Sequence, residues 1–207
     1  MPEDETAAER TTGAVNTTGI RIVPAAEASD EDIRTVFGTT GDPSRCWCQY
    51  FLLPNREWNE STVEDRRGAF FARKGRSPGL VAYRDDEPVG WCAVEPRAHY
   101  PRILRSQVLT RADAPDDDPE GTWAVSCFVV RVGHRRSGVA GALIAAAVEW
   151  AFEQGARVVE GYPVDPTARK VSAAELYHGS VGLFQRAGFR TVSRPAPGRA
   201  LVRLTRS

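Results

Sequence analysis

The sequence predicts an α/β protein with one mixed central sheet of about seven strands, flanked by about four helices. The first observation is a near-continuous apolar run over residues 123–130, which leads through a basic, glycine-containing turn into an alanine-rich helical pattern. The second is a pair of strand-like segments, residues 80–83 and 89–94, joined by a polar turn that predicts an antiparallel hairpin. The third is that further strand patterns on both sides of these segments alternate with helical ones.

The N-terminal part predicts a tail, a strand and two helices. Residues 1–18 contain almost nothing to bury and are predicted to be a disordered tail, so that a single domain covers residues 19–207. Residues 20–24 predict the first strand. Capping-box patterns that begin at Ser29 and Ser61 predict the starts of two helices, which glycines and a proline end.

The remaining elements follow the hairpin in order. Residues 95–121 are predicted to be irregular and to include an acidic, solvated loop. After the strand at residues 123–130 and its helix, residues 157–162 form another strand pattern, and a polar loop leads to a helix around residues 173–187. Two last strands, near residues 189–192 and 200–205, close the chain across a turn rich in proline and glycine.

The composition limits the class of partner. Lys and Arg together number 27, and so do Asp and Glu, so the chain has no overall basic field for nucleic acid and any phosphate recognition must be local. No apolar run approaches the roughly 18 residues of a membrane span, and the N-terminus lacks a signal-peptide pattern. The four cysteines do not form a disulfide scaffold, so we expect a reducing cytoplasm. Taken together, these observations predict a small-molecule partner and no membrane partner.

The segment Cys46-Trp47-Cys48 has two interpretations. Its two thiols could ligate a metal, but zinc sites favour C-x₂₋₄-C spacing with a second pair, and no second pair is visible. We therefore predict no metal, and expect the segment to pack in the core or to form a wall of an acceptor pocket.

The turn between the strand at residues 123–130 and the following helix predicts an anion site. Amides in the first turn of a helix lack intrahelical partners and lie at the positive end of the helix dipole, so they attract phosphate. Gly138 allows close approach of a ligand to the main chain, and Arg135 and Arg136 add positive charge. Neither a P-loop nor a dinucleotide-binding GxGxxG motif can be written here.

What the turn does contain is Arg135-x-x-Gly138-x-Ala140, with a strand before it, a helix after it and a late Phe184-x-x-x-Gly188-Phe189. This pattern resembles the R/Q-x-x-G-x-G/A signature of the GNAT superfamily of acyl-CoA-dependent N-acyltransferases. The predicted order, β-α-α-β-β-β-α-β-α-β-β, is similar to the GNAT fold over residues 19–207. The C-W-C segment resembles a bacterial subgroup of that superfamily, from which no substrate carries over.

The resemblance implies acetyl-CoA as the cofactor. In the GNAT fold the fourth and fifth strands, here residues 123–130 and 157–162, splay apart, and the pantetheine arm pairs with the exposed edge of the first of them. The loop amides hold the pyrophosphate. On this resemblance the coenzyme is bound by Phe128, Val129, Val130, Arg135, Arg136, Ser137, Gly138, Val139, Ala140, Gly141 and Phe184.

The general base has more than one candidate, because the strand before the signature carries no carboxylate. Glu160 is the leading candidate for the base, because it is the acidic side chain within the apolar run at residues 157–162. The alternative is that Glu160 points outward or pairs with an arginine such as Arg157. His178 is either a proton relay or a solvated surface residue. Cys127 is a small buried cysteine rather than a nucleophile, since direct transfer needs none.

The general acid is also open. Many members of the superfamily carry a tyrosine four residues before the closing Gly-Phe, where this chain has Phe184. Either the thiolate leaves unaided, or a hydroxyl such as that of Tyr177 or Ser180 donates the proton, or the protein is not a catalyst. We favour unaided departure, with Tyr177 lining the cleft.

These features together predict an N-acetyltransferase that transfers the acetyl group of acetyl-CoA directly to a primary amine of a small molecule. A non-catalytic acyl-CoA-binding sensor and a protein or peptide N-acetyltransferase are the alternatives. The oligomeric state is open, with a homodimer as one option.

Overall fold

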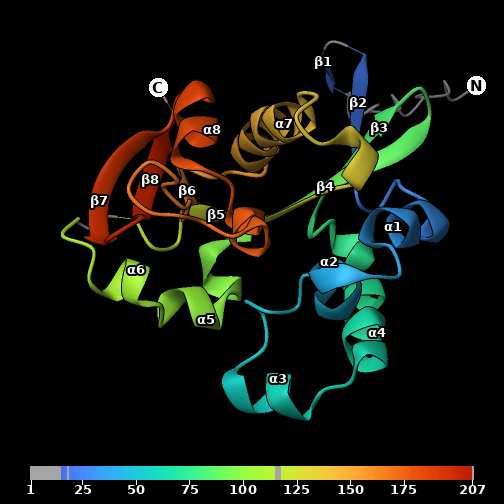
Figure 1. Cartoon of the computed structure of the whole chain (residues 1–207), viewed down its shortest axis with the longest axis horizontal. Coiled ribbons are helices and arrows are strands. Elements are labelled where there is room, and N and C mark those ends of the chain that lie inside the picture. The colour runs from blue at the N-terminus through green and yellow to red at the C-terminus, as the bar shows by residue number, and fades with distance from the viewer. Residues whose placement is uncertain (1–14, 18, 115–117, 207) are drawn as a thin grey trace, which may run out of the picture.

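The computed structural model describes residues 15–17, 19–114 and 118–206, and its centre is one eight-stranded sheet in the order β1-β2-β3-β4-β5-β6-β8-β7 (Figure 1). Neighbouring strands are antiparallel except β5 and β6, which are parallel. The predicted mixed α/β fold is therefore confirmed. The strands are β1 (Val15–Thr17), β2 (Ile20–Pro24), β3 (Gly79–Arg84), β4 (Glu87–Pro96), β5 (Thr122–Val130), β6 (Val158–Gly161), β7 (Arg190–Ala196) and β8 (Arg199–Thr205).

The sheet has one strand more than predicted because β1, which falls within the predicted tail, pairs with β2. Residues 1–14 and 18, which make up the rest of that tail, lie outside the described residues.

Short helices connect the strands. The α-helices are α1 (Asp30–Phe37), α2 (Gly41–Cys46), α3 (Asn55–Glu60), α4 (Val63–Arg73), α5 (Pro101–Leu104), α6 (Gln107–Thr110), α7 (Val139–Glu153) and α8 (Val181–Arg186). Four 3₁₀ turns join them among the described residues, namely η1 (Lys74–Arg76), η2 (Arg97–His99), η3 (Val132–His134) and η4 (Ala173–His178). Of these helices within residues 15–17, 19–114 and 118–206, none combines the length and apolar composition that crossing a bilayer requires.

Two predictions about helices need correction. The helix predicted around residues 173–187 is split, because Gly179 has a positive φ of 73° and the Ser180 side chain caps a new helix by accepting from the Leu183 amide. Residues 95–121 are less irregular than predicted, since β4 continues to Pro96 and η2, α5 and α6 follow. These turns are too short to produce a readable hydrophobic period.

The start signals of the two predicted N-terminal helices, which are α1 and α4 in the structure, are close to their predicted positions. The Ser29 side chain caps α1 by accepting from the Asp32 amide at 3.0 Å. The second capping box lies one residue later than predicted, with Thr62 as the cap and Asp65 as its partner.

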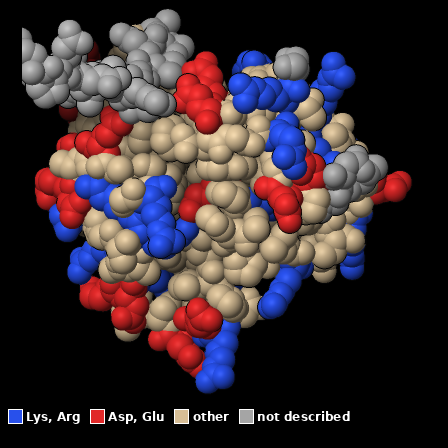
Figure 2. All heavy atoms as spheres, turned by 180° about the vertical axis from the view of Figure 1, so that it is seen from behind, with Lys and Arg blue, Asp and Glu red and all other residues tan. Residues whose placement is uncertain are grey.

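The sheet is covered on both faces. Helix α7 packs on one face over β2 to β5, and its apolar side chains form a continuous core with Leu80, Val94 and Val125. The N-terminal helices cover the other face, where Phe37, Trp47, Phe70 and Trp91 form an aromatic cluster. On the side of the molecule seen in Figure 2, acidic and basic side chains are interspersed with uncharged surface, as the equal numbers of the two charge types would suggest.

The parallel pair β5 and β6 separates midway. The strands pair from Thr122–Val158 to Val125–Gly161, after which β6 ends and β5 continues to Val130. A register shift opposite the Ala93–Val94 step of β4 marks a bulge at Ser126, where the two strands stop pairing. Within the described residues, no strand pairs with residues 126–130 on the β6 side, so the predicted splay is confirmed and leaves an open β5 edge.

Candidate active site

The predicted anion loop is tied to the β3–β4 hairpin. Arg131 donates from Nη1 to the Glu87 carboxylate at 2.5 Å and to the Pro88 carbonyl at 2.9 Å. From the same hairpin, Arg84 donates to the Ser137 carbonyl at 2.7 Å, and the Ser137 hydroxyl donates to the His134 carbonyl at 2.6 Å. The loop is therefore held in shape by the protein's own contacts.

Gly138 is the N-cap residue of helix α7 and lies where this loop ends. Its φ of 88° lies in the left-handed region, which favours glycine, and a Cβ built there would have no atom within 4 Å. The first intrahelical bond runs from the Ala142 amide to the Gly138 carbonyl, so the amides of Val139, Ala140 and Gly141 precede it and lack helical acceptors. Open space, unpaired amides and the positive end of a long helix together suit a phosphate group.

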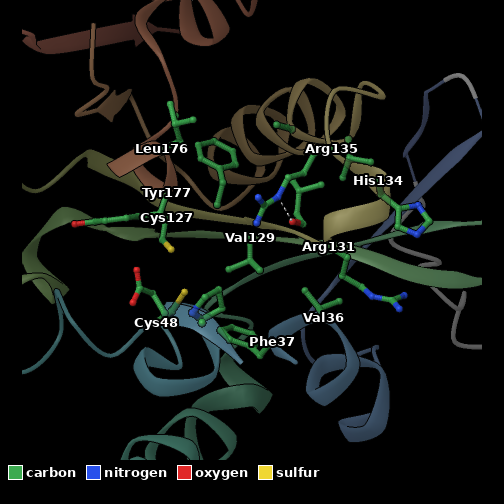
Figure 3. Close-up of a pocket in the computed structure, with 18 of the residues that line it drawn as sticks. Val36, Phe37, Cys48, Cys127, Val129, Arg131, His134, Arg135, Leu176 and Tyr177 are labelled. Carbon is green, nitrogen blue, oxygen red and sulfur yellow. Dashed lines mark hydrogen bonds between the residues drawn. The ribbon is translucent and has the colours of Figure 1, made fainter. Parts of the chain in front are cut away.

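A groove of about 2290 Å³ begins at this loop and follows the open edge of β5 (Figure 3). Small-molecule sites commonly occupy about 300–1,000 Å³, so the groove has room for a large cofactor together with a second ligand. The predicted main-chain segment Phe128, Val129 and Val130 lies along it.

The two ends of the groove differ in chemistry. Around the loop the lining is basic, and Figure 3 shows Arg131, His134 and Arg135 at that end. At the far end, Cys48 of the C-W-C segment, Cys127 of β5 and Tyr177 of η4 border the groove. The lining of this thiol and aromatic end is Cys46, Cys48, Tyr50, Phe51, Trp58, Cys127 and Tyr177.

Most of the residues predicted to bind the coenzyme line the groove. The exceptions are Ser137, whose hydroxyl and carbonyl bond within the loop and hairpin, and Phe184. The members of the predicted set that line it are Phe128, Val129, Val130, Arg135, Arg136, Gly138, Val139, Ala140 and Gly141.

Phe184 is a core residue instead. Its side chain is fully buried, and its ring packs edge-on against Phe128 and Phe189 at centroid distances of 6.0 and 5.0 Å. A Cβ at Gly161 would lie 2.1 Å from the Phe184 ring, so the glycine at the end of β6 makes room for this phenylalanine. Phe184 therefore packs between Phe128 of β5 and Gly161 of β6, where the two strands separate, and does not line the groove.

Glu160 is also outside the groove lining. Its carboxylate is fully buried and accepts from Arg203 Nε at 2.8 Å, the Tyr162 hydroxyl at 2.8 Å and Arg97 Nη1 at 3.2 Å. The assignment of Glu160 as general base is therefore not supported, and the alternative of an ion pair accounts for its charge. Its partners are Arg97 and Arg203; Arg157 pairs with Asp118.

His178 is not the solvated surface residue that was one of its two predicted roles. It is buried, packs at a centroid distance of 4.1 Å on Tyr177, and does not line the groove. Arg199 Nη2 lies 3.3 Å from its Nε2, and because a guanidinium only donates, Nε2 must be the acceptor and Nδ1 carries the proton. Burial, followed by the charge of Arg199, lowers the pKa of His178 to about 3, so the ring is neutral at physiological pH.

We expect this neutral histidine to make the protein less stable in mild acid. An unfolded histidine titrates near pH 6.5, so its contribution is fully present above that pH and is lost as the pH falls toward 3, by up to about 1.4 kcal/mol per pH unit. Urea denaturation should show that the free energy of unfolding of the wild type falls between pH 7 and pH 5. The fall should be smaller in His178→Gln. The half-exposed His99 supplies a control, since His99→Gln should leave the decline intact; an unchanged decline in His178→Gln would contradict a buried neutral ring.

Tyr177 lines the groove at its thiol and aromatic end. Its ring is half-buried and stands 6.2 Å from Phe51. Burial raises the pKa of the phenol above its ordinary value, so the hydroxyl keeps its proton at neutral pH.

The C-W-C segment is held in an uncommon backbone conformation. Trp47 and Cys48 have φ values of 48° and 50°, and each left-handed non-glycine residue costs roughly 1–2 kcal/mol. Stacking of Trp47 on Phe37 at 4.9 Å and donation from Trp91 Nε1 to Cys48 Sγ at 3.1 Å offset this strain. Cys46 and Cys48 both line the groove, and among the described residues no group of three or more His, Cys, Asp and Glu side chains is arranged to hold a metal.

One wall of the groove was not predicted. Residues 35–42, from the end of α1 to the start of α2, lie along it, and Leu176 borders it with a side chain that is 45% exposed. From the sequence, the glycines at positions 38 and 41 were interpreted only as helix breakers. No local pattern indicated that the segment between α1 and α2 faces β5.

The structure thus combines a splayed mixed sheet, a glycine-containing loop at the start of α7 and a groove along the open strand. The Acetyltransferase (GNAT) family matches residues 44–189. The chain belongs to this family, as the signature and the order of elements suggested.

Solved structures support the same fold. A GCN5-related N-acetyltransferase from Kribbella flavida shares 18% identity over 91% of this chain and 98% of its own, with a TM-score of 0.52. YncA of Salmonella typhimurium, solved with its cofactor acetyl-CoA, shares 16% identity over 90% of this chain and 94% of its own, with a TM-score of 0.51. An N-acetyltransferase from Staphylococcus aureus Mu50 shares 14% identity over 90% of this chain and 98% of its own, with a TM-score of 0.51. Among curated proteins no match is found.

Proposed function

We propose that the protein transfers the acetyl group of acetyl-CoA directly to a primary amine of a small molecule. The observation that carries this proposal is the continuity of the groove, which runs from the anion loop along the open β5 edge to the thiol and aromatic end. A cofactor and an acceptor can therefore meet beside Cys127. The related fold of YncA, which was solved with acetyl-CoA, supports the choice of cofactor.

The residues at the loop fit a pyrophosphate. The space above Gly138, the amides of residues 139–141 and the basic side chains Arg135 and Arg136 would hold it, while the main chain of residues 128–130 would pair with an amide-bearing arm. When bound, the coenzyme supplies an activated thioester. The chain then contributes position, by holding the acyl group and the amine in one cavity.

The chemistry of the lining favours an acceptor that arrives as a free amine. Neither Glu160 nor His178 lines the groove, and Asp42, whose side chain is exposed, is the one carboxylate among the lining residues that the structure describes. We therefore assign no general base to the chain, and expect the amine to lose its proton to solvent before attack.

Tyr177 tests how the leaving thiolate is protonated. Thiols have pKa values near 8.5, so a thiolate can leave without an acid, and we expect Tyr177→Phe to retain most of the turnover. The measurement is the steady-state rate together with acetyl-CoA affinity by calorimetry. A loss near a thousandfold with intact affinity would make Tyr177 the general acid instead.

The proposed function is tested by measuring thiol release from acetyl-CoA with a broad panel of amines that includes peptides. We expect release with one or more small primary amines and background rates with peptides. Faster turnover with peptide N-termini or lysines would favour a protein acetyltransferase. Tight acetyl-CoA binding with no turnover on any amine would favour a non-catalytic sensor.

A further inference from the structure

Two of the four cysteines face each other across the thiol and aromatic end of the groove. Cys127 projects from β5 and Cys48 from the turn after α2, and Figure 3 shows their sulfur atoms directed toward one another. The two residues come from positions far apart in the sequence, and the proposed function gives neither of them a role.

The fold holds this pair together from both sides. Cys127 lies opposite Ala93 in the β4–β5 register, on the sheet face that also carries Trp91 and Val129. Trp91 Nε1 donates to Cys48 Sγ at 3.1 Å, which fixes the Cys48 thiol over the same face. The left-handed conformation at Trp47 and Cys48 lets the chain turn so that the thiol points at the sheet.

The pair can also be reached from solvent. Both thiols line the groove, as does Cys46, whereas Cys92 is fully buried in the core on the α7 side of the sheet. A small oxidant that enters the groove therefore meets Cys46, Cys48 and Cys127 but not Cys92.

We infer that Cys48 and Cys127 are a site of oxidative modification, joined as a disulfide by an oxidant of the peroxide class. The bond tethers the C-W-C segment to β5 across the space where the acceptor meets the acyl group. Its effect on turnover rests on the proposed function, whereas the formation of the bond does not.

The chemistry balances with hydrogen peroxide as the oxidant. One sulfur attacks a peroxide oxygen, the O–O bond breaks, and a sulfenic acid and one water form. The second sulfur then attacks the sulfenic sulfur, the S–S bond forms, and the S–O bond breaks to release the oxygen as a second water. The two thiols lose two electrons in total, and the peroxide is reduced by the same two electrons.

The direct test is peptide mapping of the full chain by mass spectrometry. The protein is treated with hydrogen peroxide, desalted, alkylated under denaturing conditions without a reductant, and digested. We expect a peptide pair linked through Cys48 and Cys127 that disappears after dithiothreitol, with Cys92 alkylated throughout. Free Cys48 and Cys127, or a bond between Cys46 and either of them as the main product, would overturn the inference.

Functional readouts separate this inference from the proposed function. Oxidation should lower turnover by at least about tenfold, reversibly with dithiothreitol, while acetyl-CoA affinity measured by calorimetry changes much less. Cys48→Ser and Cys127→Ser, each compared with its own reduced form, should resist peroxide, whereas Cys46→Ser and Cys92→Ser should remain sensitive. If the disulfide is mapped but the protein shows no turnover, the modification site stands and only the catalytic proposal fails. If the disulfide is mapped and turnover is unchanged, the inference that the bond obstructs the space for the acceptor is overturned.

Discussion

Replacing Glu160 by alanine is expected to lower the free energy of unfolding by about 3–5 kcal/mol, the typical cost of removing one partner from a buried ion pair. Glu160 is fully buried between Arg97, which is 1% exposed, and Arg203, which is 15% exposed. Without the carboxylate, both guanidinium groups lose an acidic partner, and the Tyr162 hydroxyl loses its acceptor. Chemical denaturation would measure the loss, and a typical domain has only about 5–15 kcal/mol to lose.

Two comparisons distinguish this structural role from a catalytic one. The exposed Glu149 on α7 provides a matched control, because Glu149→Ala should change stability little. Turnover of Glu160→Ala, measured well below its melting temperature, should fall only as the folded fraction falls. Wild-type stability combined with a loss of turnover above a hundredfold would restore Glu160 as the base.

Replacing Gly138 by aspartate is expected to weaken acetyl-CoA binding by about a hundredfold or more, because like charges in close contact cost several kcal/mol. The substitution places a carboxylate above the first turn of α7, where a Cβ has no atom within 4 Å and a pyrophosphate would lie. Calorimetric titration with acetyl-CoA measures the effect directly.

Asparagine separates charge from backbone strain at this position. Asn and Asp have nearly the same shape, and both tolerate the left-handed conformation that Gly138 adopts at a φ of 88°. We expect Gly138→Asn to lose several-fold less affinity than Gly138→Asp, with similar melting temperatures. Equal losses in the two variants would mean that strain or bulk, rather than repulsion of an anion, causes the effect.

The features that could be predicted from the sequence are those encoded locally. The strand, basic turn and helix around Gly138 are contiguous, so periodicity and glycine placement were enough to predict these three elements and their order. The open edge of β5 was expected from the resemblance to the GNAT superfamily and not from any local pattern. The caps at Ser29 and Thr62 were found, or missed by one residue, for the same reason.

The features that were missed depend on contacts between distant segments. Glu160 bonds to residues 63 and 43 positions away in the chain, so its charge could be explained only once the sheet had brought Arg97 and Arg203 beside it. His178 is buried by Tyr177, Phe51 and Arg199, two of which come from other elements. Titratable residues therefore gave reasonable candidates, but their surroundings became known only from the tertiary structure.

The most direct test of the central claim is to follow an isotopically labelled acetyl group from acetyl-CoA to the acceptor by mass spectrometry. The account predicts that the label appears as an amide on a small primary amine, with one acetylated amine formed for each thiol released. Acetyl-CoA that binds at the anion loop but transfers no label to any amine, while thiol release stays at the background rate of hydrolysis, would contradict it.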